Sequence, residues 1–521
     1  MSAATRNGAG EGASPSDGHG GLLRRLLDAV ERIGNAVPHP ATLFLGLSGL
    51  VVLVSAVAAA AGVVVTHPGT GDPVAVVNLL SAGAVRRLAV ELVPNFLGFA
   101  PLGPVLVSLL GLSVAEQSGL LGAVVRVLVE RTAARFLTLA VVFAGANAHT
   151  AGDVGYVLLL PLAAALFHGA GRHPVAGLAA AFAGVSGGFA ANLLLSPTDL
   201  VLAGLTQEAA RLVDATYVVS PTASYWFLAA SVLLVTVVGT VVTERVVEPR
   251  LGVYRGAVDA PPDAALTAAE RRGLRRAGGV VVALVAIVAW GVAPADGFLR
   301  DPEAPGVLGS VLVRGLVALL FVFGVLPGVV YGVTAGTIRR DADVYRGMQR
   351  SMETLAGYLV VVFFIAQFVA LLSWSKLALV LAVHGAEFLR GFDLGPIPLL
   401  LALVFITAVT DLILGSAAAK WALLAPVLVP MFMLLGYAPE LTQTAYRVGD
   451  SLTNIITPLA SNFPLVLMFL QRYDEKAGIG TLTALMLPYS LANAVCWTAM
   501  LLAWVWAGLA TGPGAPLFLG R

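Results

Sequence analysis

Long runs of apolar residues, separated by short polar segments, dominate the chain. A helix needs about 20 such residues to cross roughly 30 Å of hydrocarbon. We therefore predict nine transmembrane helices, in residues 41–65, 93–114, 175–202, 224–242, 278–292, 307–331, 355–382, 446–470 and 483–507. The pattern indicates an all-α polytopic membrane protein, with one transmembrane domain over residues 41–509 and a C-terminal tail over residues 510–521.

Two further apolar runs, residues 136–167 and 396–435, are interrupted in the middle. The interruptions read His-Thr-Ala-Gly-Asp at residues 149–153 and Gly-Ser-Ala-Ala-Ala-Lys at residues 415–420. A broken run of this kind is typical of a re-entrant hairpin, which enters and leaves the membrane by the same face and has a tip buried in protein or water. We predict one hairpin in each run.

The distribution of basic residues predicts how the chain is oriented, because Lys and Arg accumulate on the cytoplasmic side of membrane proteins. With the N-terminus inside and both broken runs treated as hairpins, 21 of the 31 Lys and Arg residues lie in inside segments and 6 in outside segments. We expect a cytoplasmic N-terminus and a cytoplasmic loop at residues 243–277. The count does not distinguish a hairpin from two complete spans, since both keep the number of crossings even.

The first 40 residues precede the first apolar run. Residues 1–20 are small and polar, which predicts a disordered tail. Residues 21–40 interleave Arg24, Arg25 and Arg32 with leucines, which predicts an amphipathic helix on the cytoplasmic membrane surface. A cleavable signal peptide is the competing interpretation, but no short apolar core ends in a clean cleavage site.

An internal repeat relates the two broken runs. The aligned pairs are Pro161 with Pro426, Pro174 with Pro439, Tyr156 with Trp421, and Asp153 with Ala418. Each copy continues to an Asn that is followed, after two or three apolar residues, by Ser-Pro or Thr-Pro: Asn192 to Pro197, and Asn454 to Pro458. The charge count places the ends of the two hairpins on opposite sides, so we predict an inverted repeat, as in many secondary transporters. The alternative is that Pro and Gly merely kink ordinary spans.

Composition narrows the classes of function. Apolar residues make up 58% of the chain and charged residues only 12%, against about a quarter in soluble domains. The net charge of +1 leaves no basic field for nucleic acid. The single cysteine, Cys496, excludes a disulfide framework and a cysteine metal site. No phosphate-binding loop motif occurs, so we expect neither an ATP-driven pump nor a cofactor, and the lipid bilayer is the expected surrounding.

Six ionisable residues lie in or beside the interruptions: Asp153, Asp199, Asp411, Asp450, Lys420 and Arg447. Each costs about 2.5 to 3.5 kcal/mol at the centre of a membrane helix, which favours a functional role. We expect Asp450 and Asp199 to bind or exchange a cation, with Asp153 a further candidate, and Arg447 to bind a substrate carboxylate through two hydrogen bonds.

Each of these residues also has a structural alternative. Arg447 and Asp450 are three apart on a helix and could neutralise each other. Asp199 could be a helix cap exposed to the outside, Asp153 a turn residue, and Lys420 a side chain that snorkels to the membrane surface. The paired aromatic residues could be anchors at the membrane interface or could stack on an aromatic substrate.

Two rival functions remain open at this point. The string Gly184-Val-Ser186-Gly187 resembles the motif of intramembrane serine proteases, and His149 could supply a base. We disfavour this because such strings are common in small-residue helices, where they serve close packing. A channel or facilitator for organic anions is the stronger rival, because pores also tolerate re-entrant loops and charges within the membrane.

Specific strings along nearly the whole chain resemble the AbgT transporters, a family named for p-aminobenzoyl-glutamate uptake. They are Arg-Ile-Gly-Asn-Ala-Val-Pro-His-Pro at residues 32–40, Ala-Gly-Val-Ser-Gly-Gly-Phe at 183–189, Leu-Thr-Gln-Thr-Ala-Tyr-Arg-Val-Gly-Asp at 441–450, and Ile-Thr-Pro at 456–458. The resemblance implies a bowl-shaped homodimer in the bacterial inner membrane, with nine spans and two opposed re-entrant hairpins in each subunit. We add the hypothesis of an elevator-type movement, in which the core that contains the hairpins shifts against the other spans.

By the same resemblance, the residues at family positions important for transport are Asp199, Trp421, Pro439, Arg447, Asp450 and Pro458. Asn192, Asn454 and Tyr156 are added as substrate-site candidates from the repeat. A sodium or other cation site would fall near Asp411, Gly415 and Asp450, so the coupling ion is Na⁺ or H⁺. The substrate would be p-aminobenzoyl-glutamate or a sulfonamide antimetabolite, with its ring stacked on Trp421 and a glutamyl tail on Arg447.

Three positions depart from the family pattern. Asp411 stands where we expect Asn, Ala418 where Ser is usual, and Leu-Ala-Ser-Asn at residues 459–462 replaces Leu-Asn-Pro-Tyr. The first departure adds a negative charge beside the expected cation site. These differences bear on the identity of the ion and on the substrate, and they leave the predicted fold unchanged.

Overall fold

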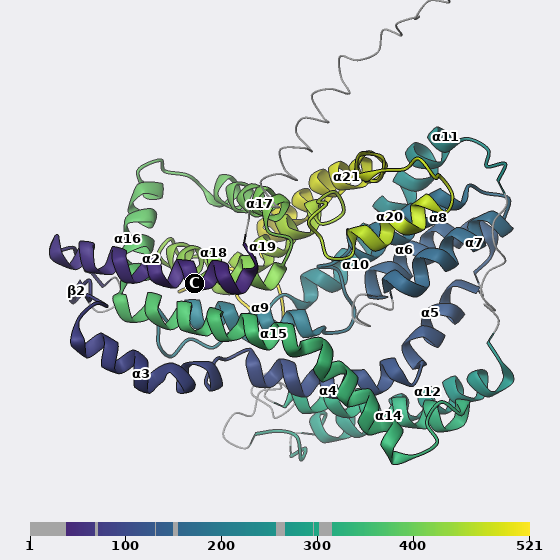
Figure 1. Ribbon diagram of the computed structural model, residues 1–521, viewed down its shortest axis with the longest axis horizontal. Helices are drawn as coiled ribbons and strands as arrows, with labels where there is room; N and C mark the ends of the chain where they lie inside the picture. The colour runs from purple at the N-terminus through teal and green to yellow at the C-terminus, as the bar shows by residue number, and fades with distance from the viewer. Residues whose placement is uncertain are drawn as a thin grey trace, which may run out of the picture.

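The computed structural model describes residues 38–67, 71–130, 132–148, 155–256, 266–294, 296–301 and 315–520. The tail predicted for residues 1–20, nearly all of the helix predicted for residues 21–40, and the residues Asp153 and His149 lie outside these ranges. Within them the chain is helical apart from loops and one small antiparallel sheet, formed by β1 (Val64–Thr66) and β2 (Pro73–Ala75) (Figure 1). This confirms the predicted all-helical class.

The helices of the described residues fall into two parts in chain order. The first part of the chain contains α2 (Pro40–Ala60), α3 (Ala82–Leu97), α4 (Leu102–Gln117), α5 (Leu120–Glu130), η1 (Ala134–Phe136), α6 (Leu137–Ala148), η3 (Gly155–Leu159), α7 (Leu160–Gly169), α8 (Pro174–Val185), α9 (Pro197–Ala210), α10 (Tyr225–Val242), η4 (Thr243–Val247) and α11 (Glu248–Leu251). The second part contains α12 (Ala268–Val292), α14 (Leu316–Ala335), α15 (Asp341–Ser375), α16 (Leu377–Arg390), α17 (Pro396–Ile413), α18 (Ala417–Leu434), α19 (Pro439–Thr453), α20 (Phe463–Gln471) and α21 (Ile479–Trp506).

Nine helical stretches of the described residues are long and apolar enough to cross a membrane. Seven of them coincide with predicted runs. The predictions for residues 175–202 and 446–470 as continuous spans are wrong, because α8 ends at Val185 and α19 ends at Thr453. The remaining two stretches are α17 and α18, the arms of the second predicted hairpin. The count of nine is therefore the same, but its members differ.

Local sequence explains why both of those runs are broken. Residues 186–196 and 454–462 lie between helices, although their neighbours are apolar. Each break contains or ends at Ser-Pro or Thr-Pro, and a proline disfavours helical backbone in the residue before it. Pro197 then serves as the first residue of α9, a position where its missing N–H costs nothing. Because the sequence around each break is apolar, hydropathy alone does not reveal where the helix stops.

Smaller differences occur at two other predicted spans. The run at residues 93–114 straddles a break between α3 and α4 at Gly98 to Pro101. The run at residues 355–382 contains the end of α15, where Lys376 has a left-handed backbone with φ of 65° before α16 begins. Both breaks occur inside apolar sequence, so hydropathy did not reveal them.

The two predicted hairpins differ in length. The arms α17 and α18 have 18 residues each, or roughly 27 Å, and are joined by residues 414–416. In the first hairpin, α6 has 12 residues and the stretch of η3 and α7 has 15, which correspond to roughly 18 and 22 Å. The arms of the first hairpin are therefore too short to cross roughly 30 Å of hydrocarbon.

The aligned prolines of the internal repeat take equivalent structural positions. Pro174 begins α8 directly after the arm α7, and Pro439 begins α19 directly after the arm α18. Each of these helices then runs into one of the two breaks. The packing also corresponds, because α9 lies against α18 of the second hairpin and α20 lies against α7 of the first. Each half of the chain thus covers the hairpin of the other half.

Two large apolar cores hold the molecule together. One joins α6, α7, α8, α10, α17, α19, α20 and α21, and the other joins α2, α4, α9, α15, α16 and α18. In Figure 1 they occupy opposite ends of an elongated molecule, with α19 and α9 between them. The C-terminal residues fold back, since the Ala438 N–H donates to the Leu517 carbonyl at 3.0 Å. The broken helices therefore lie where the two cores meet.

Candidate functional site

A cavity of about 580 Å³ opens where the two breaks approach the turn of the second hairpin. It is lined by residues of five regions: Tyr156 in η3, the end of α8 and the start of α9, the turn between α17 and α18, the break between α19 and α20, and parts of α2, α4 and α15. Its aromatic lining consists of Tyr156, Phe182, Phe189, Tyr358 and Phe463. Cavities of 300 to 1,000 Å³ with apolar walls and a few polar groups are typical of small-molecule sites.

Close backbone contacts hold the breaks and the hairpin turn together. The Ala190 N–H in the first break donates to the Ser451 hydroxyl on α19 at 3.1 Å. Gly415 in the turn leaves no room for a side chain, because a Cβ there would lie 2.8 Å from the Leu459 carbonyl oxygen of the second break. Gly415 therefore allows the backbone of the hairpin turn to approach the backbone of the second break closely.

Asp199 and Arg447 form a buried ion pair that joins the two halves of the predicted repeat. Asp199 lies in the first turn of α9, and its Oδ1 accepts a hydrogen bond from Arg447 Nη1 on α19. Its Oδ2 accepts from the Ser196 N–H at 2.5 Å and from Asn192 Nδ2 at 2.8 Å. The first of these contacts caps the helix, so the capping alternative is right about geometry and wrong about exposure, since Asp199 is buried.

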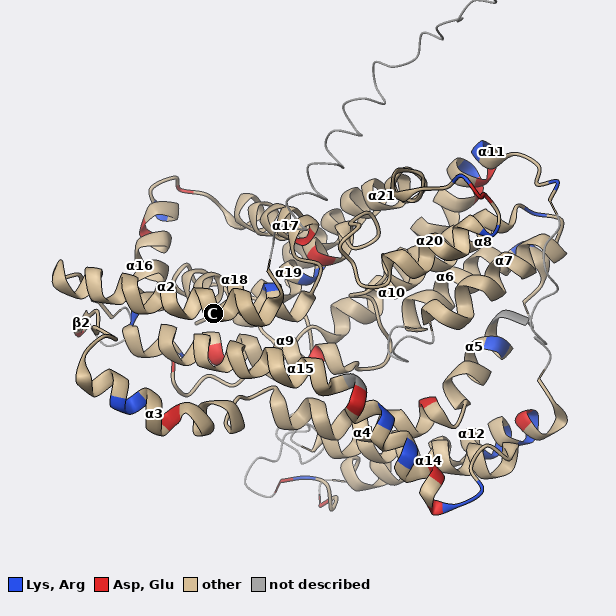
Figure 2. Cartoon of the chain, viewed as in Figure 1, with Lys and Arg blue, Asp and Glu red and all other residues tan. Residues whose placement is uncertain are grey.

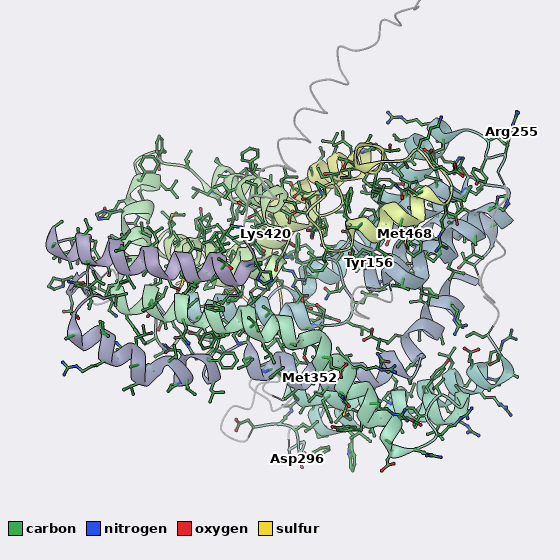
Figure 3. All side chains as sticks on the ribbon, viewed as in Figure 1. Tyr156, Arg255, Asp296, Met352, Lys420 and Met468 are labelled. Atoms are coloured by element: carbon green, nitrogen blue, oxygen red, sulfur yellow. The ribbon has the colours of Figure 1, made fainter. Side chains whose placement is uncertain are left out.

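A second buried cluster, which we call the lysine triad, consists of Asp411 on α17, Lys420 on α18 and Asp450 on α19. Lys420 Nζ donates to Asp411 Oδ1 and lies 2.5 Å from Asp450 Oδ1. The side chains of Lys420 and Asp411 are 0% exposed and that of Asp450 is 3% exposed. The cluster joins both arms of the second hairpin to α19. Lys420, labelled in Figure 3, does not snorkel to a surface, because its side chain is 0% exposed.

The lysine triad also settles the proposed pairing of Arg447 with Asp450. The two residues are three apart on α19, but Arg447 pairs with Asp199 and Asp450 pairs with Lys420. The alternative that they neutralise each other is therefore wrong. Charged residues are sparse along most helices, and several lie close together near α17 and α19 (Figure 2).

Trp421 follows Lys420 on α18 and is fully buried. Its ring stacks on that of Tyr446 with 4.3 Å between centroids, and its Nε1 donates to Thr206 Oγ1 at 2.8 Å. The protein covers the ring of Trp421 in this structure, and stacking of the substrate on it stays a prediction. The residue matched to it in the repeat, Tyr156, does line the cavity and lies centrally (Figure 3).

Several buried polar atoms have no hydrogen-bond partner among the described residues. They are Nε and Nη2 of Arg447, Oδ1 of Asn192, the hydroxyls of Tyr358 and Thr236, and Oδ1 of Asn493. Unpaired buried polar groups are costly, so each one points to a missing partner. Tyr358 lines the cavity, and Arg447 is tied to Asp199, which directly follows the cavity-lining Thr198. Of these residues only Tyr358 lines the cavity; Arg447, Asp199 and Asn192 are buried behind its wall.

The other predicted residues are placed as follows. Asn454 and Gly415 line the cavity. Pro439 begins α19, away from the cavity, and Pro458 lies in the second break beside the lining Leu459. Ser186 also lines the cavity, but the base proposed for a protease, His149, lies outside the described residues. Neither Pro439 nor Pro458 is among the residues that line the cavity.

Sequence reasoning missed three residues of the site. Tyr358 on α15 lies far along the chain from both repeats, and nothing in its neighbourhood marks it. The other two donate hydrogen bonds to the lysine triad. The Tyr446 hydroxyl donates to Asp450 Oδ1 at 3.4 Å, and the Thr453 hydroxyl donates to Asp411 Oδ2 at 2.7 Å. Their spacing of three or four residues from Asp450 on the same helix was a usable signal.

The lysine triad bears on the sodium site that the resemblance implies. Each carboxylate oxygen has an internal donor: Lys420 and Thr453 for Asp411, and Lys420, Tyr446 and Asn454 for Asp450. Gly415 has no side-chain oxygen, and the described residues contain no group of three or more His, Cys, Asp or Glu side chains that could hold a metal. The residues around Asp411 and Asp450 therefore do not fit a sodium ion in this structure.

Comparisons with known proteins extend over nearly the whole chain. This chain is 40% identical over 490 residues to the p-aminobenzoyl-glutamate transport protein of Escherichia coli (strain K12). The match covers 94% of this chain and 96% of that protein. Two solved structures are also similar. The Alcanivorax borkumensis YdaH transporter has 47% identity and a TM-score of 0.87, covering 91% of this chain and 100% of that one.

The second structure is Neisseria gonorrhoeae MtrF, which is described with a class of antimetabolite efflux pumps. It has 45% identity and a TM-score of 0.90, covering 94% of this chain and 100% of that one. A family model for the AbgT putative transporter family matches residues 25–519. These matches confirm the resemblance drawn from the sequence, and the chain belongs to the AbgT family of membrane transporters.

Proposed function

We propose that this chain is an ion-gradient-driven secondary transporter of p-aminobenzoyl-glutamate or a related aromatic amide or sulfonamide, in a bacterial inner membrane. One observation carries the proposal: a cavity of ligand size lies where two broken helices and a hairpin turn meet, and the helices that border it also carry two buried ionic clusters. Broken helices around a central site are a recurring design of secondary transporters. The direction follows from the gradients, because a coupled cycle is reversible.

The chemistry of the cavity suits an aromatic substrate with carboxylates. Five aromatic side chains line it, and a ring packs favourably on such walls. Arg447 keeps Nε and Nη2 without partners among the described residues, and these are the donors that bind a carboxylate. Ser186, Thr198, Asn454 and other polar lining groups would orient the amide. A glutamyl tail would reach Arg447 past Thr198, and a sulfonamide would use the aromatic and amide contacts alone.

The proposed mechanism moves one part of the protein against another. The two hairpins would be re-entrant and related by an inverted repeat, and the core that contains them would shift in an elevator-type movement. The swapped packing of α9 on α18 and of α20 on α7 supports this, because it ties both hairpins into one unit. The proposal includes a homodimer with cytoplasmic N-termini. Cysteine crosslinks that fix the hairpin core to the remaining spans without reducing transport would contradict the movement.

Uptake of radiolabelled p-aminobenzoyl-glutamate into proteoliposomes tests the function. We expect accumulation above equilibration when a gradient of H⁺ or Na⁺ is imposed, and loss of accumulation with Asp450→Ala. Lys476→Met, an exposed residue in the segment between α20 and α21, is the matched control and should transport normally. Equilibration that no ion gradient influences would instead favour a channel or facilitator. No uptake by well-folded protein would exclude this substrate.

A further inference from the structure

Lys420 occupies the position at which two buried carboxylates need a cation. The side chain is 0% exposed, and its ammonium group contacts one oxygen of Asp411 and one of Asp450. Two carboxylates this close repel each other in a medium of low dielectric constant unless a positive charge lies between them. The protein supplies that charge from its own chain. No bound ion is needed to bring α17 and α19 together.

The remaining carboxylate oxygens are also used within the protein. Thr453 Oγ1 donates to Asp411 Oδ2 at 2.7 Å, and Asn454 Nδ2 lies 3.4 Å from Asp450 Oδ2. A sodium ion prefers several oxygen ligands that are free to turn toward it. Here each carboxylate oxygen already accepts a hydrogen bond, and a second cation at the same place would be repelled by the ammonium group.

We propose that the Lys420 ammonium is the resident cation of the site formed by Asp411 and Asp450, where it takes the place of a sodium ion. The inference rests on the proposed transport function and deepens it, because it predicts that this chain transports without Na⁺. It also explains Asp411, since a second carboxylate gives the lysine a partner on each side. Asp411, which departs from the expected family pattern, and Lys420, which balances its charge, lie nine residues apart in one hairpin.

Removing the ammonium group gives the proposal a direct test. Lys420→Met keeps an unbranched side chain and removes the charge, so that a small monovalent cation can enter between the carboxylates. Lys420→Arg keeps the charge, and Lys476→Met removes an exposed lysine elsewhere as the matched control. The double variant Lys420→Met with Asp411→Asn keeps the wild-type formal charge of the site and is the fallback where the single variant does not fold.

The measurement is binding of radioactive sodium to purified protein, together with the melting temperature in NaCl against choline chloride. We expect no saturable sodium binding and equal melting temperatures for wild type, Lys420→Arg and Lys476→Met. Lys420→Met, or the double variant, should bind about one sodium ion per chain and melt higher in NaCl. Saturable sodium binding by wild type would overturn the proposal, as would a folded double variant that binds none.

Exchange of labelled for unlabelled p-aminobenzoyl-glutamate in sodium-free proteoliposomes separates this inference from the proposed function. Exchange by wild type at the same rate in choline and in sodium buffers is the expected result. Exchange only in sodium buffer would overturn the role of Lys420 and leave the transport function intact. No exchange in either buffer would contradict the proposed substrate, and the sodium-binding measurement would still decide the role of Lys420.

Discussion

The buried pair of Asp199 and Arg447 gives the most quantitative prediction. Asp199→Asn keeps an oxygen that can accept from Ser196 and Asn192, so the start of α9 is preserved. The change leaves the Arg447 guanidinium without an anionic partner, and two of its nitrogens have no hydrogen-bond partner among the described residues. Removing one member of a buried ion pair costs about 3 to 5 kcal/mol. That is a large part of the roughly 5 to 15 kcal/mol that stabilises a typical protein.

A double-mutant cycle measures the pair itself. Arg447→Gln alone should cost a similar amount, because it leaves a buried carboxylate. The double variant should be less destabilised than either single variant, since no uncompensated charge remains. Because each single change costs about 3 kcal/mol or more and the double change less than either, we expect an interaction energy of at least about 3 kcal/mol, at the upper end of values for contacting residues.

The assay is denaturant titration in detergent micelles, which measures the free energy of unfolding of each variant. Asp214→Asn is the control, because Asp214 is exposed and its change should stay within about 0.5 kcal/mol. Additivity of the two single variants within about 0.5 kcal/mol would refute the reasoning, since it would mean that the two side chains do not interact.

Three further predictions concern the cavity and a helix start. Gly415→Ala should destabilise the protein by about 1 to 3 kcal/mol in the same assay, because the new methyl group meets the Leu459 carbonyl oxygen at 2.8 Å. Tyr358→Phe should weaken p-aminobenzoyl-glutamate binding about 5-fold to 10-fold by calorimetry, the value of one hydrogen bond, whereas Tyr489→Phe, whose hydroxyl pairs with Thr243, should not. The backbone N–H groups of residues 339 and 340 lower the pKa of Asp343 below its ordinary value of 3.8, so its contribution to stability is present above that pH and is lost as pH falls below it. The difference in melting temperature between wild type and Asp343→Asn should shrink over that acidic range, and a constant difference would contradict this.

The sequence predicted the class of fold and most of its helices because hydropathy reports which segments lie in lipid. It failed where backbone geometry decides. Residues 186–196 and 454–462 are flanked by apolar sequence, and only the internal repeat of Asn and Ser-Pro or Thr-Pro hinted that the helices stop there. Hydropathy averages over a window about as long as a span, so a break shorter than that window disappears.

The charged residues of the site were predicted, but their partners were not. Spacing along one helix suggested that Arg447 pairs with Asp450, whereas contacts between helices pair Arg447 with Asp199 and Lys420 with Asp450. Such contacts depend on how distant segments pack, which no local pattern encodes. The same limit explains why the sequence did not predict that Tyr446 covers the ring of Trp421.

Labelling of a cysteine in the cavity tests the central claim most directly. Cys496→Ala removes the single native cysteine, and Ser461→Cys places a new one in the cavity wall. In sealed vesicles of defined orientation, we predict that impermeant thiol reagents label residue 461 from either side of the membrane and that p-aminobenzoyl-glutamate slows labelling from both sides. Labelling that the substrate does not slow, or labelling from one side only under every gradient, would contradict an alternately exposed substrate site in this cavity.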